Sequence, residues 1–399
     1  MSTDLKIFIS AGEASGEHYG TLLIPALRRL APEAQFFGLG GERMEALGFR
    51  RIVQAEDVAV MGITEVLRHM PHIYREYRRL KTAIRAEKPD AAILIDFPDV
   101  NLSLAKHLKR AGVPVIYFVS PQLWAWKKYR IREVQRYVDR MLVIFPFEEG
   151  FYRERGVEAT FVGHPLADLG GPRMSREEFA RQCGTASSND LDPARHWIGL
   201  LPGSRLKEVR LNLPEMLRAA ELLGRGGDYE FLVPLAPTLT PAQRAEIESM
   251  LAARRNIASR VTITNDARAT LRHARASVVA SGTATVEAAL IGNPFVVIYR
   301  VSPLSYAVAK RVVDVPHVAM VNLIAGRRAV PELIQGDFTA ENVVSHLQPL
   351  LEESPARERM IADLREISGM LKAGDTSESA IDRAARITTE VLRKSSQVA

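Results

Sequence analysis

Cysteine is nearly absent from this sequence, since Cys183 is the only one among 399 residues. A single thiol allows neither an intrachain disulfide nor a cysteine-rich metal cluster, which excludes disulfide-stapled secreted domains and suits a reducing compartment. Long apolar runs are also missing, and without about 18 consecutive apolar residues no segment is expected to span a membrane. The opening residues, MSTDLKIFIS, include Asp4 and too short an apolar stretch for a signal peptide. We therefore expect a cytoplasmic protein.

Long blocks of one charge are missing too, although the net charge is +6 and the isoelectric point is near 9.4. This balance favours an anionic partner without choosing among nucleic acid, lipid and small molecules. Aromatic residues do not interleave with basic ones, which argues against nucleic acid. The nine histidines form no H-x-x-x-H pattern, and the D-x-D at Asp190 and Asp192 lies in a polar loop. We therefore expect neither a metal nor a cofactor.

Short apolar runs alternate with amphipathic stretches of helical length through both halves of the chain. Runs such as AAILIDF and PVIYFVS barely alternate, as expected of parallel strands covered on both faces. The rhythm breaks around residues 163–195, which are rich in Gly, Pro and polar residues, and then restarts. The sequence predicts an α/β protein of two doubly wound domains that face a cleft, followed by helices over residues 339–396.

The stretch SAGEASGEHYG, residues 10–20, follows the first apolar run and looks like a glycine-rich turn that opens a helix. Its glycines are four residues apart, which matches neither G-x-G-x-x-G nor the P-loop. Glu13 would repel a phosphate bound there. Two interpretations stay open: the turn presents Glu13 to substrate hydroxyls, or its acids simply favour a helix N-terminus.

Two aspartates follow the third apolar run, ILIDFPDVN. Asp96 lies at the end of the predicted strand, where a partly buried carboxylate would have a raised pKa and could act as a base. Asp99 precedes a helix and is well placed as its N-cap.

Aromatic and basic residues follow the next run. Trp124 and Trp126 precede Lys127 and Lys128, so they could stack on a nucleobase or meet a lipid surface, or simply form an aromatic corner over the core. His164 lies near the predicted domain boundary, where it could reach the cleft, although a lone histidine is more often structural.

The second half carries the better anion sites. In LLPGSRLKEV, residues Gly203, Ser204 and Arg205 stand where a helix begins, and no acid precedes Glu208. In ASGTATVEAAL, the loop Ser281, Gly282 and Thr283 is followed one turn later by Glu287, which could accept hydrogen bonds from ribose. Asn322 follows another strand-like run, where a hydrogen-bonding role is plausible.

Residues 63–80, ITEVLRHMPHIYREYRRL, combine helical apolar spacing with arginines. The apolar positions include Ile63, Val66, Leu67 and Met70. They fit either a helix packed on its sheet or an arginine-fringed surface that contacts anionic lipid.

Together these motifs resemble the lipid-A-disaccharide synthases, family 19 glycosyltransferases with the GT-B fold of two Rossmann-like domains. The matching segments, in chain order, are SAGEASGE (10–17), AVMGITEVL (59–67), ILIDFPDVN (93–101), SPQLWAW (120–126), FVGHPLAD (161–168), LLPGSR (200–205), ASGTATVEAAL (280–290) and VNLIAGRRAVPELIQ (321–335). Two of these segments depart from the family. The opening motif often ends in aspartate where Glu17 stands, and the third often has alanine and phenylalanine where Phe97 and Val100 stand.

The resemblance implies domain roles and a reaction. Residues 1–170 would form the acceptor and membrane side, residues 171–375 the UDP-sugar donor side, and residues 376–399 a helix packing back toward the first domain. The enzyme would move 2,3-diacylglucosamine from UDP to 2,3-diacylglucosamine 1-phosphate with inversion, giving a β-1,6 disaccharide 1-phosphate in lipid A biosynthesis. It would work at the anionic inner face of the inner membrane as a monomer or homodimer.

The resemblance also implies site roles. Asp96 would be the base, with Glu13 positioning the acceptor. The loops at Gly203–Arg205 and Ser281–Thr283 would hold the diphosphate, Glu287 would bind ribose, and Asn322 and Gln335 would add nucleotide contacts. Acceptor or membrane contacts are expected at Ile63, Val66, Leu67, Met70, Asp99, Trp124, Trp126 and His164.

Two other activities share the expected fold. One is another UDP-sugar transferase, such as the peptidoglycan N-acetylglucosaminyltransferase, and the other is a UDP-N-acetylglucosamine epimerase. The motifs SAGEASGE and SPQLWAW argue against the first. A strict need for an acceptor would exclude the second.

Overall fold

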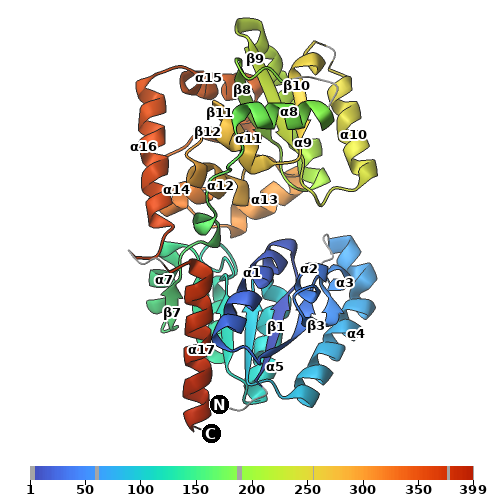
Figure 1. Cartoon of the computed structure of the whole chain (residues 1–399), viewed down its shortest axis with the longest axis vertical. Helices are drawn as coiled ribbons and strands as arrows, with labels where there is room; N and C mark the ends of the chain where they lie inside the picture. Colours follow the sequence, from blue (N-terminus) through green and yellow to red (C-terminus); the bar gives the residue numbers. More distant parts are fainter. Residues whose placement is uncertain (1–4, 59–62, 187–190, 255, 375–377, 399) are drawn as a thin grey trace. The chain divides into compact units, whose positions relative to one another are not determined.

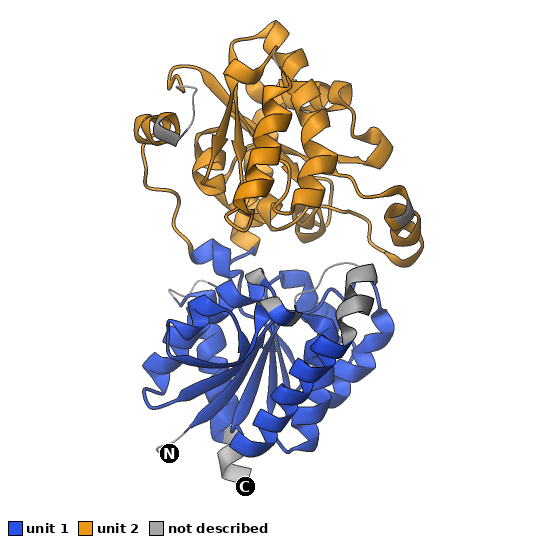
Figure 2. Cartoon of the chain, turned by 90° about the vertical axis from the view of Figure 1, so that its right-hand side faces the viewer, with its two compact units in different colours: residues 1–168, 371–399 blue, residues 169–370 orange. Residues whose placement is uncertain are grey.

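The computed structural model describes residues 5–58, 63–186, 191–254, 256–374 and 378–398. The chain forms two compact units (Figure 2). Unit 1 contains Met1–Asp168 and Leu371–Ala399, and unit 2 contains Leu169–Met370. No helix within the described ranges is long and apolar enough to cross a membrane.

Unit 1 is built on a parallel sheet flanked by helices (Figure 1). Its strands are β1 (Lys6–Ala11), β2 (Gln35–Gly40), β3 (Phe49–Gln54), β4 (Ala91–Ile95), β5 (Val115–Phe118), β6 (Arg140–Val143) and β7 (Ala159–Phe161). Its helices are α1 (Ala14–Leu30), α2 (Glu42–Glu45), α3 (Ala55–Val58), α4 (Ile63–Glu87), α5 (Pro98–Arg110), α6 (Ile131–Tyr137), α7 (Pro146–Arg153) and α17 (Ala380–Val398).

Unit 2 is also built on a parallel sheet flanked by helices. Its strands are β8 (His196–Leu201), β9 (Tyr229–Pro234), β10 (Val261–Thr264), β11 (Ala276–Ala280), β12 (Phe295–Tyr299) and β13 (Glu332–Ile334). Its helices are α8 (Arg176–Ala186), α9 (Leu206–Gly226), α10 (Pro241–Ala252), α11 (Ala267–His273), α12 (Thr283–Ile291), α13 (Pro303–Val312), α14 (Met320–Ala325), α15 (Ala340–Leu351) and α16 (Pro355–Met370).

The apolar runs form the central strands because helices cover both faces of each sheet. Every residue of β4, AAILI, is buried, and so is every residue of β11, ASVVA. Burial on both faces removes the need for alternation, which is why these runs read as continuous. The prediction of two doubly wound parallel sheets is confirmed.

Strand order places the ligand-binding edge of each sheet. The order is β3-β2-β1-β4-β5-β6-β7 in unit 1 and β10-β9-β8-β11-β12-β13 in unit 2. The order reverses between β1 and β4 in the first sheet and between β8 and β11 in the second. Ligands of open parallel sheets bind beyond the carboxyl ends of the strands at such switch points. The loops after these four strands are therefore the candidate sites.

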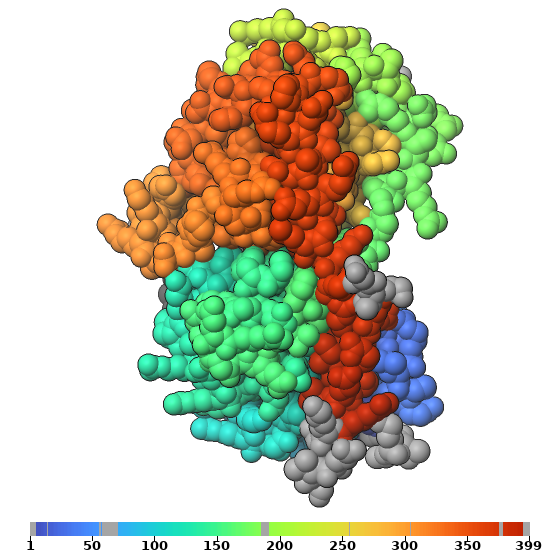
Figure 3. Space-filling model, turned by 90° about the vertical axis from the view of Figure 1, so that its left-hand side faces the viewer, coloured from blue at the N-terminus to red at the C-terminus, as the bar shows by residue number. Residues whose placement is uncertain are grey.

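The last helix belongs to unit 1 although unit 2 precedes it in sequence. Figure 3 shows it in red along the surface of this unit, and it packs against α1. Asp382 pairs with Arg29, and the Asp168 carboxylate accepts the backbone N–H of Ala380 at 2.7 Å. Ala384 and Ala385 of this helix are fully buried.

Candidate functional site

Asp96 lies immediately beyond β4, at the switch point of unit 1. The pairing of Ala11 with Ile95 brings the turn after β1 beside it. The pKa of Asp96 is raised from 3.8 to about 6, mainly by burial and also by the negative charge of Glu13. A carboxyl with such a pKa is mostly ionised at neutral pH and is a stronger proton acceptor than an ordinary aspartate.

The backbone at Asp96 is held in an unusual conformation. Asp96 and Phe97 both have left-handed φ angles, +48° and +46°. For residues with a Cβ this conformation costs roughly 1–2 kcal/mol each, and it clusters at functional sites. The Tyr117 hydroxyl donates to the Asp96 carbonyl at 2.5 Å, so buried contacts fix the turn.

The two glutamates of the opening stretch have different surroundings. Glu13 stands at the N-cap position of α1, close enough to Asp96 for their charges to interact. Glu17 turns away, and its carboxylate accepts the backbone N–H of Arg43 at 2.9 Å. A Cβ on Gly41 would lie 2.2 Å from the Glu17 carboxylate, so this glycine lets the acid reach the start of α2. Of the two glutamates, Glu13 is the one whose charge acts on Asp96.

Asp99 does not cap its helix, so this prediction is wrong. Phe97 occupies the N-cap position of α5 and Pro98 the first turn, which leaves Asp99 inside the helix. Its side chain is 71% exposed and pairs with Arg130 at 2.5 Å and with Lys127 at 3.4 Å. The left-handed turn at Asp96 and Phe97 lets the helix begin before Asp99, and the hydrophobic periodicity of the sequence does not reveal such a turn.

The two tryptophans after β5 differ in exposure. Trp126 is 39% exposed, with the Lys127 ammonium 4.3 Å from its ring centroid. Trp124 is half-buried, and its indole N–H donates to Glu148 at 3.0 Å. The surface-contact interpretation therefore suits Trp126 better than Trp124.

Glu148, in α7, binds the loop that follows β5, and it was not identified from the sequence. Its carboxylate also accepts the Ser120 hydroxyl at 2.6 Å and the Phe145 N–H at 3.2 Å. Complete burial raises the pKa of Glu148 to about 7 despite these hydrogen bonds. In the sequence, Glu148 belongs to the acidic pair of FEEG. Such a pair is typical of a solvent-exposed helix start, so nothing in the sequence indicates a buried carboxylate here.

His164 is only 2% exposed. Its Nδ1 accepts the backbone N–H of Leu166 at 3.2 Å, and its ring packs against Phe145 with centroids 5.4 Å apart. Burial lowers the pKa of His164 to about 4, so the ring is neutral at physiological pH. These contacts agree with the structural interpretation that the sequence left open.

In unit 2, the loop after β8 opens α9 as predicted, with Arg205 at its N-cap position. Gly203 has φ of +120°, a conformation that favours glycine. Glu208 reaches back into this loop and accepts the backbone N–H groups of Ser204 at 3.1 Å and Arg205 at 3.4 Å. An anion would compete with this carboxylate for the same donors. The Arg205 side chain is 55% exposed and lies 3.5 Å from Glu208.

The loop after β11 lies beside the first, because β11 pairs with β8. Gly282 and Thr283 are exposed at the start of α12, while the Ser281 hydroxyl donates to the Val318 carbonyl at 3.3 Å. Glu287 lies one turn further, where burial raises its pKa although Arg268 opposes the shift. The two predicted anion loops therefore meet at one edge of the sheet.

Asn322 is fully buried, and its side-chain amide is hydrogen-bonded within the chain. It lies in α14 rather than after a strand, so the predicted local structure is wrong. Its amide nitrogen donates to Val330 and Glu332, and its oxygen accepts the backbone N–H groups of Ala329 and Val330. Gln335 follows β13 with φ of +53°, and its amide donates to the Val301 carbonyl at 3.2 Å.

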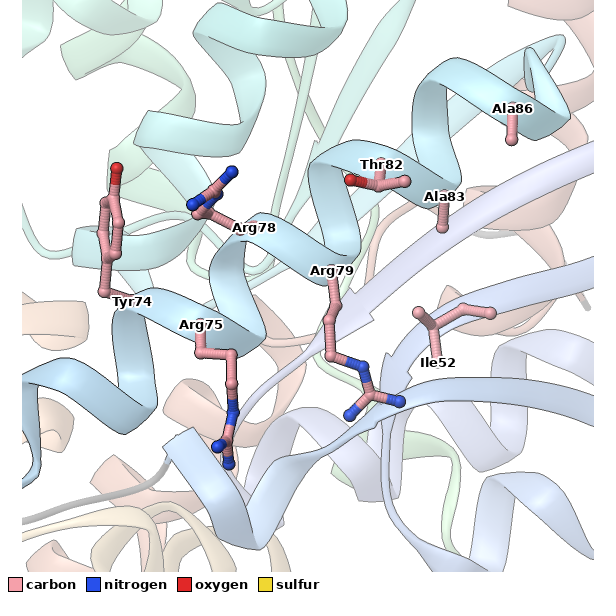
Figure 4. Close-up of a pocket in the computed structure, with 8 residues that line it drawn as sticks. All are labelled: Ile52, Tyr74, Arg75, Arg78, Arg79, Thr82, Ala83 and Ala86. Carbon is pink, nitrogen blue, oxygen red and sulfur yellow. The ribbon is translucent and has the colours of Figure 1, made fainter.

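The predicted lipid-facing residues lie on α4. The side chains of Ile63, Val66, Leu67 and Met70 lie outside the described residues. Further along this helix, a pocket of about 560 Å³ opens between α4 and β3 (Figure 4). It is lined by Ile52, Tyr74, Arg75, Arg78, Arg79, Thr82, Ala83 and Ala86. The surface thus combines apolar groups with arginines.

Comparison with known proteins adds a family match. The model of the family described as lipid-A-disaccharide synthetase matches residues 7–383. The lipid-A-disaccharide synthase of Acidobacterium capsulatum is 63% identical over 99% of this chain and 98% of its own. That of Koribacter versatilis is 51% identical over 98% and 99% of the two chains.

Solved structures share the fold at low identity. A putative UDP-N-acetylglucosamine 2-epimerase from Listeria monocytogenes has a TM-score of 0.62 at 13% identity, over 99% of this chain and 98% of that one. A UDP-glucose:anthocyanidin 3-O-glucosyltransferase in complex with UDP has a TM-score of 0.61 at 12% identity, over 99% and 100%. At such identities the likeness shows the fold alone, and it confirms the predicted GT-B architecture.

Proposed function

This chain belongs to the lipid-A-disaccharide synthase family, and from that premise we propose the substrates and the roles of its residues. The protein is a glycosyltransferase of lipid A biosynthesis. We propose that its donor is UDP-2,3-diacylglucosamine and its acceptor 2,3-diacylglucosamine 1-phosphate. The mildly basic balance of the chain suits both anionic substrates.

Asp96 is the proposed general base. The acceptor 6-hydroxyl attacks the anomeric carbon of the donor while Asp96 takes the hydroxyl proton. The bond from that carbon to the diphosphate oxygen breaks in the same step, and UDP leaves with the bonding pair. One displacement inverts the α-linked donor to a β-1,6 product and needs no covalent enzyme intermediate. The observation that carries this role is a raised-pKa carboxyl beside Glu13 at the switch point of unit 1.

The loops after β8 and β11 are the proposed diphosphate site. Backbone N–H groups at two adjacent helix starts, together with the exposed Arg205, can stabilise the negative charge that grows on the leaving UDP. Binding there requires Glu208 to release the N–H groups of Ser204 and Arg205. Glu287 is proposed for ribose. Asn322 and Gln335 would support this edge mainly by holding its backbone, because their amides are already bonded within the chain.

The proposed reaction is tested by incubating the purified protein with UDP-2,3-diacylglucosamine or with UDP-N-acetylglucosamine, each with and without 2,3-diacylglucosamine 1-phosphate. We expect UDP release only when UDP-2,3-diacylglucosamine and 2,3-diacylglucosamine 1-phosphate are both present. Turnover of UDP-N-acetylglucosamine without acyl chains would instead support another UDP-sugar transferase. Conversion of UDP-N-acetylglucosamine to its C2 epimer without any acceptor would support an epimerase.

The pH dependence of kcat/KM should report the interaction between Asp96 and Glu13. The base must be ionised, so kcat/KM should fall as the pH drops through the pKa of Asp96, about 6. The negative charge of Glu13 raises that pKa, so Glu13→Gln should lower it and move the acid limb to lower pH. The measurement is kcat/KM from pH 4.5 to 8 for both proteins. A limb that stays in place, or moves to higher pH, would contradict the proposed coupling of the two acids.

We also propose that the α4 surface contacts the anionic inner face of the inner membrane, since both substrates carry acyl chains. Tyr74 is 61% exposed beside Arg75, Arg78 and Arg79, which supports an interfacial contact. Figure 4 shows Arg75 and Arg79 extending from α4 on the side of Ile52. The neighbouring positions Ile63, Val66 and Leu67 are proposed to add apolar contact.

The membrane proposal predicts weaker vesicle binding in two variants. The triple change of Ile63, Val66 and Leu67 to serine, and Arg78→Glu, should each reduce cosedimentation with phosphatidylglycerol vesicles. The reversal at Arg78 should cost about fivefold or more, since each basic residue near an anionic surface contributes about 1 kcal/mol. Arg359→Glu, at an exposed position of α16, is the control. Unchanged binding, or an equal loss in the control, would instead favour a helix whose apolar face serves only the core.

A further inference from the structure

Asn101 joins the two strands that carry the proposed catalytic acids. It lies in α5 and is fully buried, so it has no exposed surface with which to contact a substrate. Its amide nitrogen donates to the Asp96 carbonyl at 2.7 Å and to the Ile95 carbonyl at 3.1 Å. Its amide oxygen accepts the hydroxyl of Ser10, a fully buried residue of β1, at 2.6 Å. One side chain therefore ties the carboxyl end of β1 to that of β4.

The turn that Asn101 contacts needs such support. Asp96 and Phe97 are consecutive left-handed residues, and neither is glycine. A conformation of this kind persists only where the surrounding structure over-determines it. The Asp96 carbonyl accepts two side-chain donors, Asn101 and the Tyr117 hydroxyl, so its peptide plane is fixed from two directions.

Alanine at position 101 would remove all of these bonds. Aspartate would remove the donors and place a carboxylate against the carbonyls of Ile95 and Asp96. Only an amide supplies donors to β4 and an acceptor to β1 within the same volume.

We propose that Asn101 is a positioning residue for the transfer reaction, holding the Asp96 carboxyl in register with Glu13 across the β1–β4 switch point. The inference rests on the proposed role of Asp96 as the base. Its effect on catalysis is indirect, because Asn101 acts on the backbone of Asp96 and on Ser10. Burial and the negative charge of Glu13 raise the pKa of Asp96, and a hydrogen bond from the Phe97 backbone opposes them. Asn101 carries no charge, so a change to alanine at position 101 alters this balance only by moving the Asp96 carboxyl.

The test compares Asn101→Ala and Asn101→Asp with the unaltered enzyme, at a temperature where circular dichroism shows each protein folded. We expect kcat to fall at least tenfold, while the Kd for UDP changes less than twofold because the nucleotide loops belong to unit 2. The acid limb of kcat/KM should move to lower pH in Asn101→Ala, since a released Asp96 carboxyl would gain water and move from Glu13. Ser10→Ala removes one of these bonds and should have a smaller effect in the same direction.

Leu108→Ala separates positioning from general loss of stability. Leu108 is fully buried on the same helix, two turns further on, and has no bond to the Asp96 turn. It should lower the melting temperature as Asn101→Ala does but leave kcat per folded molecule and the pH profile unchanged. If kcat and the acid limb of Asn101→Ala match those of Leu108→Ala, the positioning role is overturned while the base role of Asp96 stands. If Asp96→Asn is itself fully active, both proposals fall together.

Discussion

Changing Asp96 to asparagine should abolish transfer while the enzyme still binds UDP. The variant keeps the shape of the side chain and its left-handed turn but cannot accept the proton of the acceptor hydroxyl. Loss of a general base typically costs between about 100-fold and 10,000-fold, so we expect kcat to fall at least 100-fold. The measurement is steady-state turnover with the acylated substrates, together with calorimetric binding of UDP.

Asp90→Asn is the matched control for this variant. Asp90 precedes the same strand at its opposite end, where it accepts the backbone N–H of Lys6 at 2.8 Å. An asparagine oxygen can accept the same bond, so turnover should stay within twofold of normal. Near-normal turnover by Asp96→Asn would remove Asp96 from the base role. Loss of UDP binding in that variant would point instead to a wider structural failure.

Replacing Gly12 with alanine should also cause a large loss of activity. A Cβ at this position would lie 2.2 and 2.4 Å from two carbons of the Phe97 ring, closer than real atoms approach. Phe97 follows Asp96 in the strained turn, so a displaced ring would carry the base with it. Overpacking of this kind costs about 1–3 kcal/mol of stability, and we expect kcat to fall at least tenfold. Thermal unfolding and turnover measured on the same samples check both effects.

Two further variants make the Gly12 prediction specific. Gly16→Ala, in the same stretch, places its Cβ 3.5 Å from the nearest atom, an ordinary contact. Because alanine favours helix over glycine by up to about 1 kcal/mol, this variant should be active and no less stable. Gly12→Ala with Phe97→Ala should recover activity to the level of Phe97→Ala alone. If the double variant is as impaired as Gly12→Ala, the contact with Phe97 is not the cause.

The parts of the fold that could be predicted from sequence are those set by local pattern. Continuous apolar runs bounded by turns identified buried parallel strands, and the position of Asp96 at a strand end followed directly from ILIDF. Because parallel strands share a carboxyl edge, the sequence also placed the turn with Glu13 near the same edge. The raised pKa of Asp96 agrees with the partial burial expected there.

What could not be predicted depends on contacts between distant residues. Glu17 and Glu13 look equivalent in sequence, yet Glu17 is drawn to the start of α2, 26 residues away. Asn322 lies in an apolar run that resembles a strand, but it is helical, and its amide binds the backbone of the following turn. Glu148 is separated by 28 residues from Ser120, so periodicity cannot reveal that a buried acid holds the loop after β5.

The chain passes from unit 1 into unit 2 and back, and this path sets an order of assembly during synthesis. Unit 2 is continuous, so all of its residues are synthesised before Leu371 is added. Unit 1 begins first but lacks α17 until the end, and without it the paired Arg29 and the buried side of α1 stay uncovered. The unit with the proposed base is thus the first to begin and the last to be completed, because its final helix can pack against α1 only after the whole of unit 2 has been synthesised.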